Sequence, residues 1–127
     1  ERALDHASRV LRPGARLLVL ADPQQALRIA PARWGALAQH HDVTLLLLVD
    51  PLESQPPSAA LQFLAAQQRV SLDLRRKEVQ AQWRAHFVEP VDALRRQLAA
   101  RRIDVQLLST DAASDAWLAP AVTEVPA

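Results

Sequence analysis

Two short apolar runs, each ended by an aspartate and a proline, constrain this chain more than any other feature. Residues 17–21 follow the turn formed by Pro13 and Gly14 and stop at Asp22, and residues 43–49 stop at Asp50 in the same way. Unbroken apolar runs of strand length are typical of parallel strands buried on both faces. The pattern therefore predicts a parallel sheet that lies between helices.

Helical periodicity fills the segments around these runs. It predicts helices over residues 1–11 and 31–41, and a long one over residues 76–102, in which apolar side chains recur every three or four positions. Pro90 falls inside the long segment, but the apolar stripe keeps its phase, which predicts one kinked helix. A third strand is expected over residues 103–108. The predicted fold class is α/β, a three-layer, mostly parallel sheet flanked by helices.

The segment before the long helix has a different pattern. Residues 61–65 and 70–74 alternate between apolar and polar side chains, which predicts a short antiparallel hairpin that turns around residues 67–68. We expect residues 1–118 to form a single domain and residues 119–127 to be a frayed tail.

Composition excludes several classes of protein. The 15 basic and 14 acidic side chains leave a formal net charge of +1, so no strong field favours nucleic acid or anionic membranes. Cysteine is absent, which excludes disulfides and thiolate metal sites. No apolar run reaches the length of a membrane span and no signal pattern opens the chain. We therefore expect a cytoplasmic protein without a membrane segment.

Polar residues follow the ends of the predicted strands, where open α/β sheets place their ligands. Asp22 follows the first strand, Asp50 and Glu53 follow the second, and Thr110 and Asp111 follow the third. Their oxygens are ligands that suit a magnesium ion. Each of them is also a favoured cap for the turn or helix that comes next. Capping and metal binding both remain open from the sequence alone.

Other residue types that often carry chemistry have ordinary explanations. His40 and His41 lie at the end of a predicted helix, where a protonated imidazole is favoured by the helix dipole. His86 lies beside the apolar stripe of the long helix. Trp34 and Trp83 belong to apolar stripes, which predicts that these two tryptophans are core residues. The chain lacks a Gly-x-Ser-x-Gly element, and its two glycines cannot form a phosphate-binding loop.

A series of short motifs connects these elements in a fixed order. They are Arg12-Pro13-Gly14, Ala21-Asp22, His41-Asp42-Val43, Asp50-Pro51-Leu52-Glu53 with Pro56 after it, and Leu107-Leu108-Ser109-Thr110-Asp111. In this order the chain resembles the carboxyl-terminal half of a bacterial family, the domain-of-unknown-function family fifty-eight, whose members carry a von Willebrand factor A-like domain. The resemblance covers nearly all of residues 4–118.

The resemblance implies a partial von Willebrand A-like, Rossmann-like domain. Its implied role is that of a non-catalytic interaction or assembly module beside a MoxR-type AAA+ ATPase, with no enzymatic activity. Von Willebrand A domains often bind a divalent ion through an Asp-x-Ser-x-Ser loop, a threonine and a later aspartate, and Asp22 matches only the last of these. Ala21 and Pro23 also depart from the serine and the apolar residue that the family tends to have. We therefore expect no cofactor here, and magnesium only in a longer parent protein.

The resemblance also bears on the first strand. In a full domain another strand would pair with it, and the absence of the upstream half would leave Leu17, Leu18, Val19 and Leu20 at an edge. Exposed edges recruit other chains. We expect this interaction edge to form a homodimer by strand pairing or exchange.

Two other classes of function compete with the interaction module. One is a metal-dependent or hydrolytic α/β enzyme that uses Asp22, Asp50 and Glu53. The other is a nucleic-acid binder that uses the long helix, which the neutral net charge disfavours.

Overall fold

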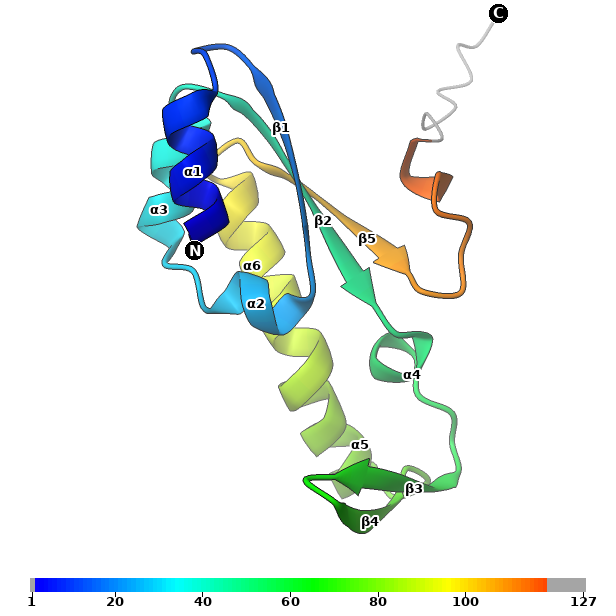
Figure 1. Cartoon of the computed structure of the whole chain (residues 1–127). Helices are drawn as coiled ribbons and strands as arrows, with labels where there is room; N and C mark the ends of the chain where they lie inside the picture. The colour runs from blue at the N-terminus through cyan, green and yellow to red at the C-terminus, as the bar shows by residue number, and fades with distance from the viewer. Residues whose placement is uncertain (1, 119–127) are drawn as a thin grey trace, which may run out of the picture.

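The computed structural model describes residues 2–118, so the predicted tail at 119–127 lies outside the described residues. Figure 1 shows the elements along the chain. They are α1 (Arg2–Val10), β1 (Arg16–Ala21), α2 (Pro23–Leu27), α3 (Pro31–Ala38), β2 (Asp42–Val49), α4 (Pro51–Ser54), β3 (Ala60–Ala65), β4 (Gln68–Asp73), α5 (Lys77–Trp83), the π-helical turn η1 (Arg84–Val88), α6 (Glu89–Ala99), β5 (Asp104–Ser109) and the 3-10 turn η2 (Ala116–Leu118).

The three long strands form a parallel sheet in the order β1-β2-β5. Leu17 of β1 lies opposite Val43 of β2, and Leu45 of β2 lies opposite Val105 of β5. Helices flank the sheet, and β3 and β4 form a separate two-stranded antiparallel sheet. The predicted α/β fold class with a short hairpin is confirmed.

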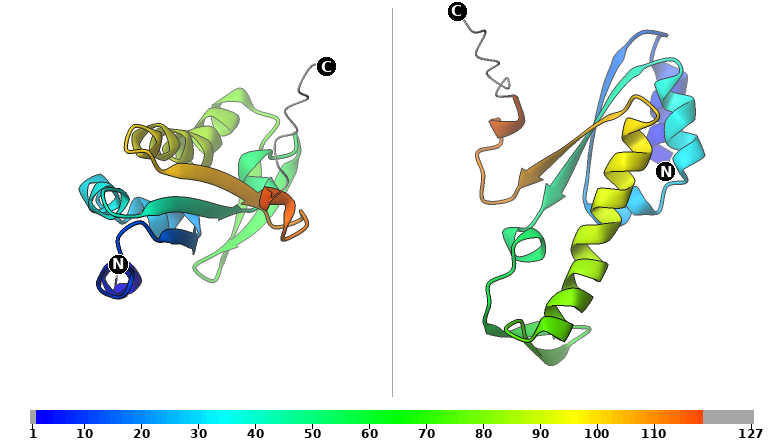
Figure 2. Two further views of the ribbon diagram at one scale, coloured as in Figure 1. Left: turned by 90° about the horizontal axis from the view of Figure 1, so that it is seen from above. Right: turned by 180° about the vertical axis from the view of Figure 1, so that it is seen from behind.

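One face of the sheet packs against a layer of helices. Side chains at alternate positions of β1 and β2, such as Val19 and Leu45, join the same core as Leu4 of α1, Trp34 of α3 and Leu98 of α6. The view from above shows α1, α3 and α6 on one side of the strands (Figure 2, left). Trp34, Leu45 and Leu98 have no exposed surface, which confirms the prediction that Trp34 is a core residue.

The other face of the sheet is only partly covered. The prediction that the first strand is buried on both faces is wrong, because Leu18 and Leu20 are 40% and 57% exposed. Leu48 of β2 is also exposed on this face, while Leu46 and Leu108 are buried on it. The reason is that α1, α2, α3 and α6 all pack on the opposite face. We call Leu18, Leu20 and Leu48 the open sheet face.

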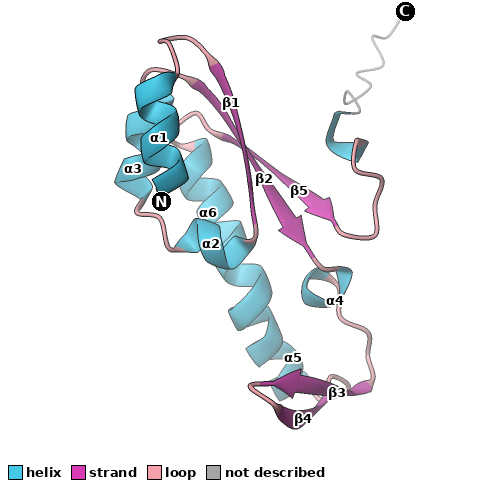
Figure 3. Cartoon of the chain, in the orientation of Figure 1, coloured by secondary structure: helices cyan, strands magenta, loops and turns pink. Residues whose placement is uncertain are grey.

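A single helix runs across Pro90, as predicted. Segments α5, η1 and α6 continue without a break from Lys77 to Ala99. Proline has no backbone N–H and its ring crowds the preceding turn, so an α-helix must widen or bend there. The π-helical turn from Arg84 to Val88 accommodates Pro90 in this way. The helix extends past the sheet and reaches the hairpin (Figure 3).

The hairpin turn lies one residue earlier than predicted. Ala65 pairs with Gln68, so the two turn residues are Ala66 and Gln67, with φ values of 48° and 66°. Two-residue hairpin turns of type I′ need positive φ at both positions and favour Asn and Gly. Neither residue type is present here, so the sequence held no marker for the turn.

Candidate functional site

Two of the predicted site residues cap short helices that the sequence analysis did not anticipate. Asp22 precedes α2 and its Oδ1 accepts the N–H of Gln25 at 2.8 Å, while the Gln25 side chain accepts the N–H of Asp22 at 3.4 Å. Asp50 precedes α4 and accepts the N–H of Leu52 at 2.8 Å. In both cases proline follows as the first helical residue, where its missing N–H is not needed. The capping interpretation is confirmed for Asp22 and Asp50.

The same two aspartates also meet in one pocket at the carboxyl ends of the strands. Its volume is about 440 Å³, and Glu53 and Thr110 line it as well. The prediction that these polar groups gather at one edge of the sheet therefore holds for four of them. Asp111 does not line the pocket; it accepts a hydrogen bond from the Ser109 hydroxyl.

The far wall of this pocket comes from the long helix and was missed by sequence reasoning. His86 and Phe87 from η1, and Pro90 and Val91 from the start of α6, line it. The sequence places His86 beside the apolar stripe but does not show that the helix crosses the strand ends. Only the packing of the helix against the sheet brings His86 to the carboxylates.

Glu53 is a carboxyl group of the pocket with a perturbed pKa. Partial burial raises the pKa of Glu53 above its ordinary value of 4.5, and the charges of Asp50 and Asp22 raise it further, while His86 lowers it. The backbone carbonyl of Glu53 accepts a hydrogen bond from Trp83 Nε1 at 3.1 Å. That bond ties the segment carrying Glu53 to the long helix.

The described residues at this edge show no ready-made cluster of metal ligands. Among residues 2–118, no group of three or more His, Cys, Asp or Glu side chains is placed to hold a metal ion. Asp22 and Asp50 each use one carboxylate oxygen for a helix cap. Asp22 as a metal ligand therefore stays a prediction.

The predicted interaction edge lies on β1. Among the described strands, β1 pairs only with β2, so its outer edge carries backbone groups without a strand partner. Leu17 and Val19 pack against the core, while Leu18 and Leu20 belong to the open sheet face. Arg16 begins the strand with a 92% exposed side chain, 3.7 Å from Asp42.

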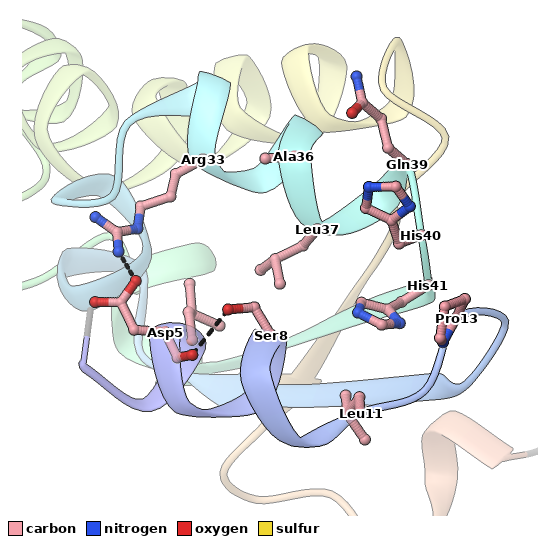
Figure 4. Close-up of a pocket in the computed structure, with 11 residues that line it drawn as sticks. Asp5, Ser8, Leu11, Pro13, Arg33, Ala36, Leu37, Gln39, His40 and His41 are labelled. Carbon is pink, nitrogen blue, oxygen red and sulfur yellow. Dashed lines mark hydrogen bonds and ion pairs between the residues drawn. The ribbon is translucent and has the colours of Figure 1, made fainter.

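A larger cavity of about 710 Å³ lies between α1 and α3 (Figure 4). Arg33 forms an ion pair with Asp5 across it, and the Ser8 hydroxyl donates to the Asp5 carbonyl at 2.8 Å. His41 lies after the end of α3, and its buried Nδ1 has no hydrogen-bond partner among the described residues. The helical spacing of α1 predicted the helix but not the element it packs on.

Over residues 2–118, fold and site together define an α/β protein with a small parallel sheet, a capped carboxylate pocket and a strand, β1, whose outer edge has no strand partner. No family model, curated protein or solved structure matches the chain. Within residues 2–118, no helix is long and apolar enough to cross a membrane.

Proposed function

We propose that this chain is a non-catalytic protein-interaction module of the von Willebrand A-like type, which works with a MoxR-type AAA+ ATPase in the bacterial cytoplasm. The outer edge of β1 and the open sheet face beside it are the proposed binding surface. The same surface is proposed to bind a second copy of the chain. The MoxR-type partner rests on the family resemblance alone.

The observation that supports the proposal is the position of Leu18 and Leu20. They are exposed on a strand that, among the described strands, has a neighbour on one side only. Apolar side chains beside an unpaired strand edge favour association, because another chain then satisfies the backbone groups and buries the leucines. A strand or helix of the partner protein is a suitable occupant.

A pull-down with a purified MoxR-type AAA+ ATPase, in ATP and in ADP, tests the proposal. We expect the ATPase to be retained, and Leu20→Lys to reduce retention, because a charge then lies on the open sheet face. Leu64→Lys is the matched control, since Leu64 is 76% exposed on the hairpin, away from β1. Lack of retention by the wild-type chain, or an equal loss in both variants, would contradict the proposal.

A hydrolytic enzyme is the second candidate, and the carboxylate pocket is the observation that favours it. A carboxyl group with a raised pKa beside a histidine suits general acid catalysis, and Glu53 lies near His86 in this way. Assays with ester and phosphoester substrates, with and without magnesium, test this candidate. Turnover that disappears in Glu53→Gln would replace the interaction proposal, whereas equal turnover in both proteins would reject catalysis by Glu53.

A further inference from the structure

We infer that two copies of this chain pair through their β1 strands in an antiparallel arrangement centred on Val19, forming a continuous six-stranded sheet. The inference rests on the proposed function and specifies the partner and the register at the β1 edge. It follows from three properties of β1: the faces of its side chains, the charges at its two ends and the proline beyond it.

The faces of the side chains limit the possible registers. Residues that lie directly opposite each other in an antiparallel pair point to the same face of the sheet. Leu18 and Leu20 point to the open face, whereas Leu17 and Val19 point to the helices. The two copies keep their helices on one side only if open-face residues lie opposite open-face residues. The centre of the pairing must then be a residue and not a peptide bond.

The charges and the proline select Val19 among the possible centres. With Val19 opposite itself, Leu18 lies opposite the partner's Leu20, and Arg16 lies opposite the partner's Asp22. Asp22 is suited to this position because its backbone is extended, with φ −78° and ψ 161°, and the cap on α2 uses only Oδ1. Arg16 already lies 3.7 Å from Asp42 of its own chain, but its side chain is 92% exposed and can share its charge with the partner's Asp22. Two symmetric ion pairs then frame a cluster of four leucines.

The neighbouring registers lack this match. A centre at Leu18 places Arg16 opposite the partner's Leu20, so the charge faces an apolar side chain and Asp22 has no partner. A centre at Leu20 places Leu18 opposite the partner's Asp22, and Leu17 then lies opposite the partner's Pro23, which cannot donate to the ladder. Charge complementarity therefore favours the Val19 register over both.

Sedimentation velocity over a micromolar concentration series tests the inference on the full chain. We expect a reversible dimer, and Arg16→Glu or Asp22→Lys alone to weaken it about tenfold, because each variant faces two like-charge pairs in its own dimer. An equimolar mixture of the two variants should regain wild-type affinity. In the mixed dimer the introduced acid faces the introduced lysine, and the unchanged Arg16 faces the unchanged Asp22.

Two control variants separate pairing from general effects. Arg69→Glu changes an exposed arginine on β4, and Asp50→Lys removes a helix cap away from the edge; neither should change the dimer. If Arg16→Glu and Asp22→Lys each dimerise like wild type, or if their mixture dimerises no better than either variant alone, the register is wrong.

Cross-linking reports the register directly, because the chain has no cysteine of its own. We expect a mixture of Leu18→Cys and Leu20→Cys to form disulfide-linked dimers faster than either variant alone, since these positions lie opposite each other. A faster reaction of Leu18→Cys with itself would overturn the Val19 centre while leaving dimerisation intact. A strictly monomeric wild type that still binds the ATPase would reject this inference and not the proposed function.

Discussion

The parallel sheet and the hairpin are both built from strands, but they depend on different interactions. In the sheet, Leu45 and Leu47 of β2 have no exposed surface, because neighbouring strands and a layer of helices enclose them. In the hairpin, most side chains of β3 and β4 are exposed, and Phe63 packs on Trp83 with ring centroids 5.3 Å apart. The sheet is stabilised by burial and the hairpin by attachment to one helix.

The difference follows from how each set of strands is connected. Parallel strands need long crossover segments, and the helices in those segments supply the apolar surface that covers the sheet. A hairpin needs only a two-residue turn, so it forms locally but gains little burial from its own residues. We therefore expect substitutions to have large effects in the sheet and small ones in the hairpin.

Truncation of one leucine in each region gives the largest expected contrast. Leu45→Ala should lower the free energy of unfolding by about 3–4 kcal/mol, because it leaves a cavity in a fully enclosed core. Leu64→Ala in β3 should change it by less than about 0.5 kcal/mol, since that side chain is 76% exposed. Urea unfolding followed by circular dichroism measures both. Similar losses in the two variants would contradict the comparison.

A pair of tryptophan substitutions tests the hydrogen bond that joins α4, the segment before the hairpin, to the long helix. Trp83→Phe should destabilise by about 1–2 kcal/mol, because it leaves the Glu53 carbonyl without the bond from Nε1. Trp34 is the control, since its buried Nε1 has no hydrogen-bond partner in the described structure and Trp34→Phe breaks no such bond. We expect the smaller loss at Trp34, measured by urea unfolding. Faster proteolysis between β2 and β3, where α4 lies, should accompany only Trp83→Phe.

Glycine substitutions at residues with positive φ test local backbone strain in each region. Gln67 in the hairpin turn has φ 66°, and Arg102 between α6 and β5 has φ 63°. Gln67→Gly and Arg102→Gly should each stabilise by about 0.5 kcal/mol, because glycine adopts this conformation without strain. Gly14→Ala is the opposite change at φ 83°, where no atom obstructs an added Cβ, and it should destabilise. Melting temperatures that shift in the same direction for all three variants would contradict the strain argument.

Opposite pH dependences at the two regions form the smallest expected effect. The pKa of Glu53 is raised, which means that the folded state binds the carboxyl proton more tightly than the unfolded state does. The contribution of Glu53 to the free energy of unfolding therefore falls as pH rises from 4.5 through the folded pKa. Glu53→Gln should therefore raise the urea midpoint at pH 7 and not at pH values well below 4.5.

Asp73 at the end of β4 has the opposite sign. A side-chain hydrogen bond from Arg75, supported by a backbone bond and charge, lowers the pKa of Asp73 below its ordinary value of 3.8. The contribution of Asp73 to the free energy of unfolding is present above pH 3.8 and is lost as pH falls through the folded pKa. Asp73→Asn should lower the urea midpoint slightly at pH 7, and the difference should vanish in strong acid. If the urea midpoints of Glu53→Gln and Asp73→Asn changed with pH in the same way, the predicted difference between the two carboxyl groups would be wrong.

Local signals predicted most of the elements. The apolar runs and their Asp-Pro ends located β1 and β2, and the unbroken stripe showed that one helix continues across Pro90. The same aspartates identified the edge at which Asp22, Asp50, Glu53 and Thr110 line a pocket. The turn at Ala66 and Gln67 was misplaced because neither residue carries the usual marker for positive φ.

The sequence by itself determined the order of the three parallel strands and the longer helices, because prolines and apolar periodicity act over a few neighbouring residues. Only the tertiary structure decided what surrounds them. The helices pack on one face of the sheet, so Leu18 and Leu20 stay exposed although they lie in an unbroken apolar run. The long helix crosses the strand ends and brings His86 to Glu53, since packing joins residues that no local pattern connects.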